Sequence, residues 1–193
     1  MYSTLESLLG GDFYLPELLV DSYIIPAVQK PGKLKPNPNS AKKLADIIKA
    51  VGQAPSAQPI PPMPEIAARI AGKRFKLEDS SSISLVFKDG KECWLNLFSN
   101  GTQYDFSVGL DGVFRIADAK DWGSLPAHNW IACKGAWMDE QTFMITFREL
   151  GDVGEIQEYY TFDGNQITIK TFSKIADTYI WENKGVMEQD SQD

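Results

Sequence analysis

The residues of this chain that could do covalent chemistry are few and scattered. Ser40 and Lys43 stand three positions apart, a spacing that puts a hydroxyl and an amine on one helical turn, where lysine could take the hydroxyl's proton. Nucleophilic catalysis also needs oxyanion donors and partner groups, and the sequence has no G-x-S-x-G elbow, later S-D-N or K-T-G segment, or glycine-rich phosphate loop. We therefore expect Ser40 to cap a helix, and we expect no catalytic residue and no enzyme activity in this chain.

The thiol and imidazole groups do not form a recognisable metal site. Cys93 and Cys133 lie forty positions apart, and His128 has no second histidine to share a metal. No H-E-x-x-H or paired C-x-x-C is present. We expect both cysteines to be buried free thiols, although a contact across a sheet stays open, and His128 to be a surface or hydrogen-bonded residue. The sequence predicts no metal and no cofactor.

Aromatic and charged side chains leave a ligand cavity open as an alternative to simple core packing. Acidic pairs such as Glu155 and Glu158 are interpreted as turn residues or solvated strand faces. Arg115 and Arg148 stand in apolar strands, and each would need a partner or an anionic ligand if it pointed inward. The residues that we predict for such a cavity are Trp94, Arg115, Trp130, Trp137, Phe143 and Arg148, with Phe147, Tyr159 and Tyr160 as further aromatic candidates.

Composition excludes several classes of protein. The chain has 193 residues, with 26 acidic and 19 basic side chains and a net charge of −7, which argues against nucleic-acid binding. A hydrophobic share of 43% and an aromatic share of 11% exclude a disordered chain. No apolar run reaches the roughly 18–20 residues of a membrane span, and no signal peptide is recognisable, so we expect a cytoplasmic location unless the chain is a fragment of an exported protein.

Patterning predicts a helical segment, a linker, a β-domain and a tail. Residues 1–52 show helical spacing, with a break at Pro26 and a helix over 41–51 that has one apolar face and ends at Gly52. Residues 53–64 hold five prolines in twelve positions, which is typical of a semi-rigid linker. Residues 65–186 form the predicted β-domain, in which a short helix over 64–70 comes first and alternation with a period of two begins at Lys73. Residues 187–193 indicate a disordered tail.

Nine or ten short strands with tight turns occupy the β-domain. Asp89-Gly90, Asn100-Gly101 and Asp163-Gly164 are typical of hairpin turns between such strands. A sheet of that size usually closes on itself, because closure removes the exposed edges. The sequence therefore predicts a mainly β fold, an antiparallel up-and-down (lipocalin-like) β-barrel of about 8–10 strands with an N-terminal helical segment. A two-sheet sandwich is the alternative.

Four segments of the β-domain, taken in order, carry a family resemblance: AGKRFKLE (71–78), GLDGVFR (109–115), GAWMD (135–139) with Thr142-Phe143, and TFDGN (161–165) with ITI (167–169). Together they resemble the β-module that follows the catalytic domain in bacterial serine hydrolases of the class C β-lactamase and penicillin-binding-protein group. Residues 23–27 and the helix over 40–51 are similar to the tail that joins the two domains, so the resemblance covers roughly residues 22 to 180.

The resemblance implies an accessory module without the catalytic domain. The nucleophilic Ser-x-x-Lys and its partner motifs belong to the domain that precedes the module in that family, so Ser40 does not inherit their role. The implied function is a non-catalytic accessory or interaction barrel, whose partner is a serine hydrolase catalytic domain in cis or in trans, or a second copy bound through the N-terminal helix. The alternative is a free-standing lipocalin-like binder of a small apolar or amphipathic ligand.

Overall fold

The computed structural model describes residues 20–28, 36–53, 55–119, 130–150 and 154–189. The chain divides into two compact units, Met1–Ser56 and Ala57–Asp193. In the first unit the described elements are η1 (Val20–Ile24), α3 (Ile25–Val28) and α4 (Pro38–Val51). Pro26, where the sequence predicts a break, is the second residue of α3, because proline is tolerated in the first turn of a helix. Among the described residues of both units, no helix has the length and apolar character needed to cross a membrane.

Helix α4 begins earlier than predicted and has a different cap. The Asn37 side chain accepts a hydrogen bond of 3.0 Å from the Ser40 backbone N–H, and Pro38 occupies the first turn. Asn37 is therefore the N-cap, and the expectation that Ser40 caps this helix is wrong, because proline at the first helical position favours a start at Pro38. The helix ends at Gly52, as predicted.

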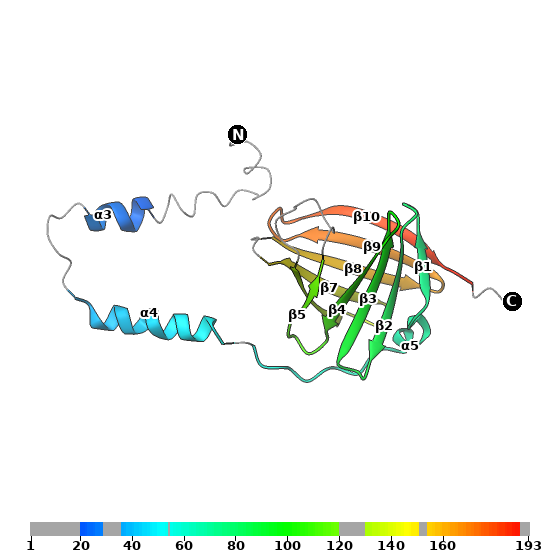
Figure 1. The fold of residues 1–193 in the computed structure, drawn as a ribbon, viewed down its shortest axis with the longest axis horizontal. Helices are drawn as coiled ribbons and strands as arrows, with labels where there is room; N and C mark the ends of the chain where they lie inside the picture. Colours follow the sequence, from blue (N-terminus) through cyan, green and yellow to red (C-terminus); the bar gives the residue numbers. More distant parts are fainter. Residues whose placement is uncertain (1–19, 29–35, 54, 120–129, 151–153, 190–193) are drawn as a thin grey trace. The chain divides into compact units, whose positions relative to one another are not determined.

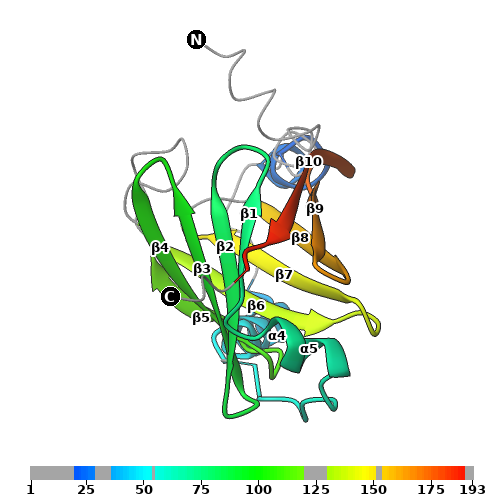
Figure 2. The ribbon, with the colours of Figure 1, turned by 90° about the vertical axis from the view of Figure 1, so that its right-hand side faces the viewer.

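The second unit begins inside the proline-rich segment. The Gln58 N–H donates to the Asp111 carbonyl at 2.8 Å, and the side chains of Ile60 and Met63 pack against the core. Helix α5 (Glu65–Ile70) follows and buries Ile66 and Ile70 at the end of the barrel where β1 starts (Figures 1 and 2). Residues 57–64 of the predicted linker thus belong to the compact β-unit.

Ten strands form one sheet that closes on itself. Their order in the sheet is β4-β3-β2-β1-β10-β9-β8-β7-β6-β5. Each strand in this order is antiparallel to the strands next to it. A parallel pairing of Gly109 in β4 with Lys134 in β6 closes the ring, with β5 beside it (Figure 2). The predicted mainly antiparallel barrel is confirmed; the parallel contact between β4 and β6 and an isolated parallel bridge between Ala71 and Leu85 are the differences. The strands are β1 (Arg74–Leu77), β2 (Ser82–Lys88), β3 (Glu92–Ser99), β4 (Thr102–Gly109), β5 (Arg115–Asp118), β6 (Trp130–Trp137), β7 (Thr142–Glu149), β8 (Glu155–Asp163), β9 (Gln166–Ser173) and β10 (Thr178–Met187).

One hairpin shows how local sequence sets the register of these strands. Asn100 and Gly101 join β3 to β4 with φ values of 51° and 79°. Two consecutive positive φ values define a tight turn whose twist matches that of the flanking strands, and asparagine and glycine tolerate them best. The turn sets Ser99 opposite Thr102 and, through the alternation of the strand, places Cys93 and Leu95 inside the barrel.

The barrel interior has two different ends. At the end that α5 covers, aromatic rings fill the space: Phe143 lies 5.1 Å from Trp137 and 5.7 Å from Phe87, measured between ring centroids. Phe162 extends this group towards Phe75, with ring centroids 5.6 Å apart. Rings in such contact leave no room for a ligand. The other end of the interior, where β1 turns into β2 and β3 into β4, is packed less completely.

Candidate ligand-binding site

A cavity of about 190 Å³ lies inside the barrel at the end opposite α5. Its wall is mostly aliphatic and aromatic, with a small number of polar groups, which is the usual composition of a small-molecule site. The volume is below the roughly 300 Å³ at which sites for drug-sized ligands begin, so any ligand held inside is small. The residues that line it are Leu77, Asp79, Ser81, Ile83, Leu95, Leu97, Ser99, Phe106, Phe147, Glu158, Tyr160, Ile169 and Trp181.

The register of β7 to β10 places the polar groups of this wall side by side. Glu158 pairs with Ile145 on one side and Thr171 on the other, and Thr171 pairs with Trp181. Because side chains alternate along a strand, Glu158 shares the inner face of β8 with the buried residues Tyr160 and Phe162. A carboxylate therefore stands in a row of inward-facing side chains.

Glu158 is held by two hydroxyl groups. The Tyr160 hydroxyl donates a short hydrogen bond to Oε2, and the Thr171 hydroxyl lies 3.5 Å from Oε1. Burial raises the pKa of Glu158 above its ordinary value, and these two hydrogen bonds offset part of the increase. Burial together with the neighbouring carboxylate raises the pKa of Tyr160 well above its ordinary value, so Tyr160 remains a hydrogen-bond donor. The Glu158 side chain is partly exposed to solvent, as its position on the cavity wall requires.

A second carboxylate, Asp79, lines the cavity from the β1–β2 turn. It accepts hydrogen bonds from the Ser81 backbone N–H at 2.9 Å and from the Ser81 hydroxyl at 2.5 Å. Burial raises the pKa of Asp79, but the Ser81 hydrogen bonds and the nearby Asn183 amide outweigh it, so the pKa is lowered and the group stays ionised. Asn183 is only 5% exposed, and its Nδ2 makes no hydrogen bond of good geometry within the described structure.

None of the aromatic residues in the predicted site lines this cavity. Trp137 and Phe143 do face inward, but they belong to the packed aromatic end. Trp94 lies on the outer face of β3, where the Lys88 ammonium sits 4.7 Å from its ring centroid, and Trp130 is 53% exposed on the outer face of β6. Strand parity puts Trp94 and Trp130 outside the barrel, and close packing occupies Trp137 and Phe143, so the structure does not bring these four residues together around this cavity.

The two predicted arginines lie at the surface of the barrel with partners of their own. Arg115 forms ion pairs with Glu92 at 2.9 Å and with Asp111 at 3.0 Å. Arg148 pairs with Glu155, and its guanidinium lies 5.0 Å from the Phe114 ring centroid. Hydrogen bonding by Arg115 lowers the pKa of Asp111, as expected for a carboxylate beside a permanent cation. Neither arginine is left to bind an anionic ligand inside the barrel.

The sequence carried a signal for Glu158 that our interpretation missed. Residues 156, 158, 160 and 162 alternate as Ile, Glu, Tyr and Phe, so the strand period alone puts this glutamate on the apolar face. Of the further aromatic candidates, Phe147 and Tyr160 do line the cavity. The interpretation of Glu158 as a solvated residue is wrong, because an exposed face would need it to share the parity of Tyr159.

The cysteines are free and buried, as predicted. Burial and then the charge of Glu158 raise the pKa of Cys133 to about 12, and burial raises the pKa of Cys93 still further. Both thiols also contribute to the raised pKa of Tyr160. Such thiols stay protonated and are poor nucleophiles. In the described part of the chain no three histidine, cysteine or acidic residues gather to hold a metal ion, and His128 lies outside the described residues.

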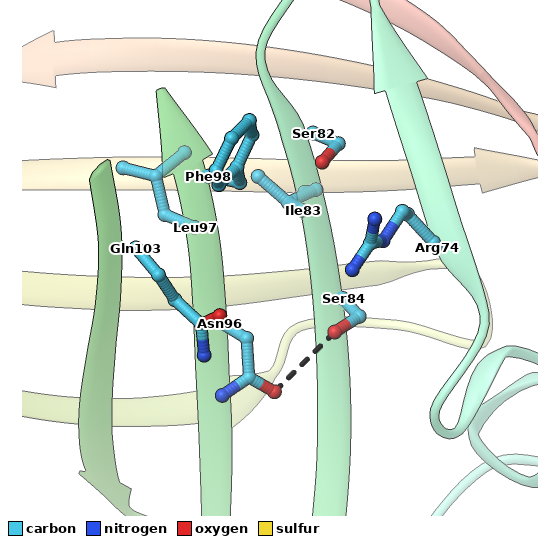
Figure 3. Close-up of a pocket in the computed structure, with 8 residues that line it drawn as sticks. All are labelled: Arg74, Ser82, Ile83, Ser84, Asn96, Leu97, Phe98 and Gln103. Carbon is cyan, nitrogen blue, oxygen red and sulfur yellow. Dashed lines mark hydrogen bonds between the residues drawn. The ribbon is translucent and has the colours of Figure 1, made fainter. Parts of the chain in front are cut away.

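A second depression, of about 240 Å³, lies over β1 to β4 and is less suited to a ligand (Figure 3). Its polar groups already bond to one another: the Ser84 hydroxyl donates to Asn96 at 3.3 Å, and the Asn96 amide donates to Asp105 at 2.6 Å. Gln103 also donates to Asp105, at 3.0 Å. Because these donors have partners, the interior cavity is the better candidate.

The fold and the cavity together define a closed β-barrel with a small, partly polar interior site. Comparison with known proteins adds no closer assignment: no protein-family model matches this chain, and no curated protein sequence matches it.

Proposed function

We propose that the barrel is a lipocalin-like binding module that holds one small amphipathic ligand in the cavity at the end opposite α5. The observation that carries this proposal is the placement of Glu158 and Tyr160 at the wall of a mostly apolar interior space. A buried polar row has a cost in folding free energy that apolar side chains would avoid. Ligand binding would explain why these polar groups are present despite this cost, because a few polar groups in an apolar cavity fix the orientation of a bound molecule.

Filling the cavity is expected to abolish binding. The probes are benzylamine, benzyl alcohol and benzoate, each titrated into the ¹⁵N-labelled full chain. We expect at least one probe to shift backbone amides around the cavity in the NMR spectrum. Leu97→Trp places a larger side chain in the cavity and should reduce the affinity at least about tenfold, or about 1.4 kcal/mol. Phe98→Trp, one residue along on the outer face of β3, is the matched control and should bind like wild type. Failure of all three probes to bind wild type would contradict the proposal.

A second candidate function, a non-catalytic accessory module of a serine hydrolase, is supported by α4. Its apolar stripe of Leu44, Ile47, Ile48 and Val51 is exposed, at 58%, 49%, 62% and 80%. Burying four such side chains is worth roughly 1.5–3 kcal/mol each, whereas a lone helix of this length is marginal in water. We propose that this stripe binds a hydrolase catalytic domain, or a second copy of the chain where that domain is absent.

Two charges on the stripe are expected to weaken self-association of the full chain. Leu44→Asp with Ile48→Asp should lower the sedimentation coefficient towards that of a monomer and make residues 1–60 more sensitive to protease, while the β-type circular dichroism of the barrel is retained. Asn39→Asp with Lys49→Gln makes the same change in net charge on the polar face and should leave association unchanged. A wild-type chain that is monomeric at about 100 μM, or a double variant that unfolds completely, would contradict this prediction.

A further inference from the structure

The charged residues that line the cavity are all acidic. Asp79 and Glu158 both line it, and none of the lining residues in the described structure is a lysine, arginine or histidine. The described residues give Glu158 two hydroxyl donors and no ion pair. A carboxylate enclosed by protein is unfavourable unless a cation or several hydrogen bonds compensate its charge. The structure therefore contains an interior carboxyl group for which the described chain supplies no counter-ion.

Glu158 also has acceptor capacity left over. An ionised carboxylate offers about four lone-pair positions, and Tyr160 and Thr171 use one on each oxygen. The Thr171 contact, at 3.5 Å, is at the long limit for a hydrogen bond. A further donor can therefore approach either oxygen from the cavity without displacing the Tyr160 hydroxyl.

The rest of the wall suits a cation that carries an apolar body. Trp181, at 43% exposed, lines the cavity together with the Tyr160 ring, and indole and phenol faces attract ammonium groups. Ile83, Leu95 and Phe106 supply apolar surface on the side of β2 to β4. The chain as a whole carries a net charge of −7, which favours the approach of cations and disfavours anions.

We propose that the cavity selects a small organic cation, a primary ammonium group on an aromatic or aliphatic body, with Glu158 as its counter-ion. This inference rests on the proposed binding function and names the ligand class for the same site. The raised pKa of Glu158 fits an anion without a counter-ion, and a bound ammonium would lower it again. Asp79, nearer the turn, adds negative potential that attracts the same charge.

The test compares near-isosteric probes on the wild-type full chain, so that no variant has to fold. At pH 7 we expect benzylamine, which is protonated, to bind at least about tenfold more tightly than benzyl alcohol, and benzoate to show no saturable shift in the NMR titration. Equal affinity for the amine and the alcohol, or a preference for benzoate, would overturn the inference while leaving the cavity as a binding site. No binding of any probe would overturn both proposals.

Two glutamate variants then locate the effect. Glu158→Gln keeps the size of the side chain and removes its charge, so it should reduce benzylamine affinity to that of benzyl alcohol without changing the affinity for the alcohol. Glu182→Gln makes the same charge change beside Trp181 but on the exposed face of β10, and should retain the preference for the amine. A preference for the amine that survives in folded Glu158→Gln would show that Glu158 is not the counter-ion, and would overturn the inference.

Discussion

Replacing Phe143 by alanine is expected to lower the free energy of unfolding by about 3–5 kcal/mol, the usual cost of removing a large buried aromatic side chain. Phe143 is 0% exposed, and its ring contacts Trp137 and Phe87. A Cβ atom built on Gly135 would lie 2.7 Å from Cζ of Phe143, so this ring fills the space above that glycine. Its removal leaves a cavity that neighbours in a closed sheet can fill only in part.

The matched control for this variant is Phe98→Ala. Phe98 is 44% exposed on the outer face of β3, so its truncation is expected to change the free energy of unfolding by less than about 1 kcal/mol. Urea unfolding followed by circular dichroism measures both variants. Similar losses in the two variants would contradict the close packing of Phe143 inside the barrel.

Glu158→Gln is expected to stabilise the ligand-free protein at alkaline pH. Burial raises the pKa of Glu158 in the folded protein above its ordinary value of 4.5. At pH values between the pKa in the unfolded chain and the raised pKa in the folded protein, Glu158 is protonated in the folded state and ionised in the unfolded state. The free energy of unfolding therefore falls as pH rises through this window. Each pKa unit of elevation corresponds to a loss of about 1.4 kcal/mol above the window. The neutral glutamine does not titrate and avoids that loss.

Urea unfolding at pH 4, 6 and 8 tests this prediction. We expect the gain from Glu158→Gln to be largest at pH 8 and to become small near pH 4, where Glu158 is protonated in both folded and unfolded states. Glu182→Gln, on the exposed face of β10, should show no such gain. A Glu158→Gln variant that is less stable than wild type at pH 8 would mean that the carboxylate is stabilised by the folded protein, in contradiction to its raised pKa.

A stabilising Glu158→Gln variant that has lost the preference for the amine would separate folding from binding in this protein. Residues that bind ligands are often unfavourable for stability, because the partner of their polar groups is the ligand and not another group of the protein. Tyr160 and Thr171 reduce that penalty, yet the described chain provides no cation. The two experiments on Glu158 are therefore independent, since one measures stability without ligand and the other measures relative affinity.

The sequence by itself favoured a barrel over a two-sheet sandwich and located most of the strands. Alternation with a period of two, interrupted by turn pairs such as Asn100-Gly101, is a local property. Local backbone preferences were enough to place the turns between β2 and β3, β3 and β4, β6 and β7, and β8 and β9. The apolar stripe of α4 and its end at Gly52 follow from helical spacing in the same way. The cap of α4 was misplaced because Pro38 and Asn37 compete with Ser40 for the helix start, and only the geometry shows which one wins.

The tertiary structure alone decided where the cavity lies and which side chains reach it. Trp94 and Phe143 are both large aromatic residues in apolar strands, yet closure of the sheet puts one outside and packs the other against Trp137. The cavity arises because the side chains of facing strands, far apart in sequence, fill one end of the interior and not the other. Strand parity predicts that Glu158 points inward, but the free space in front of it depends on how the whole ring of strands closes.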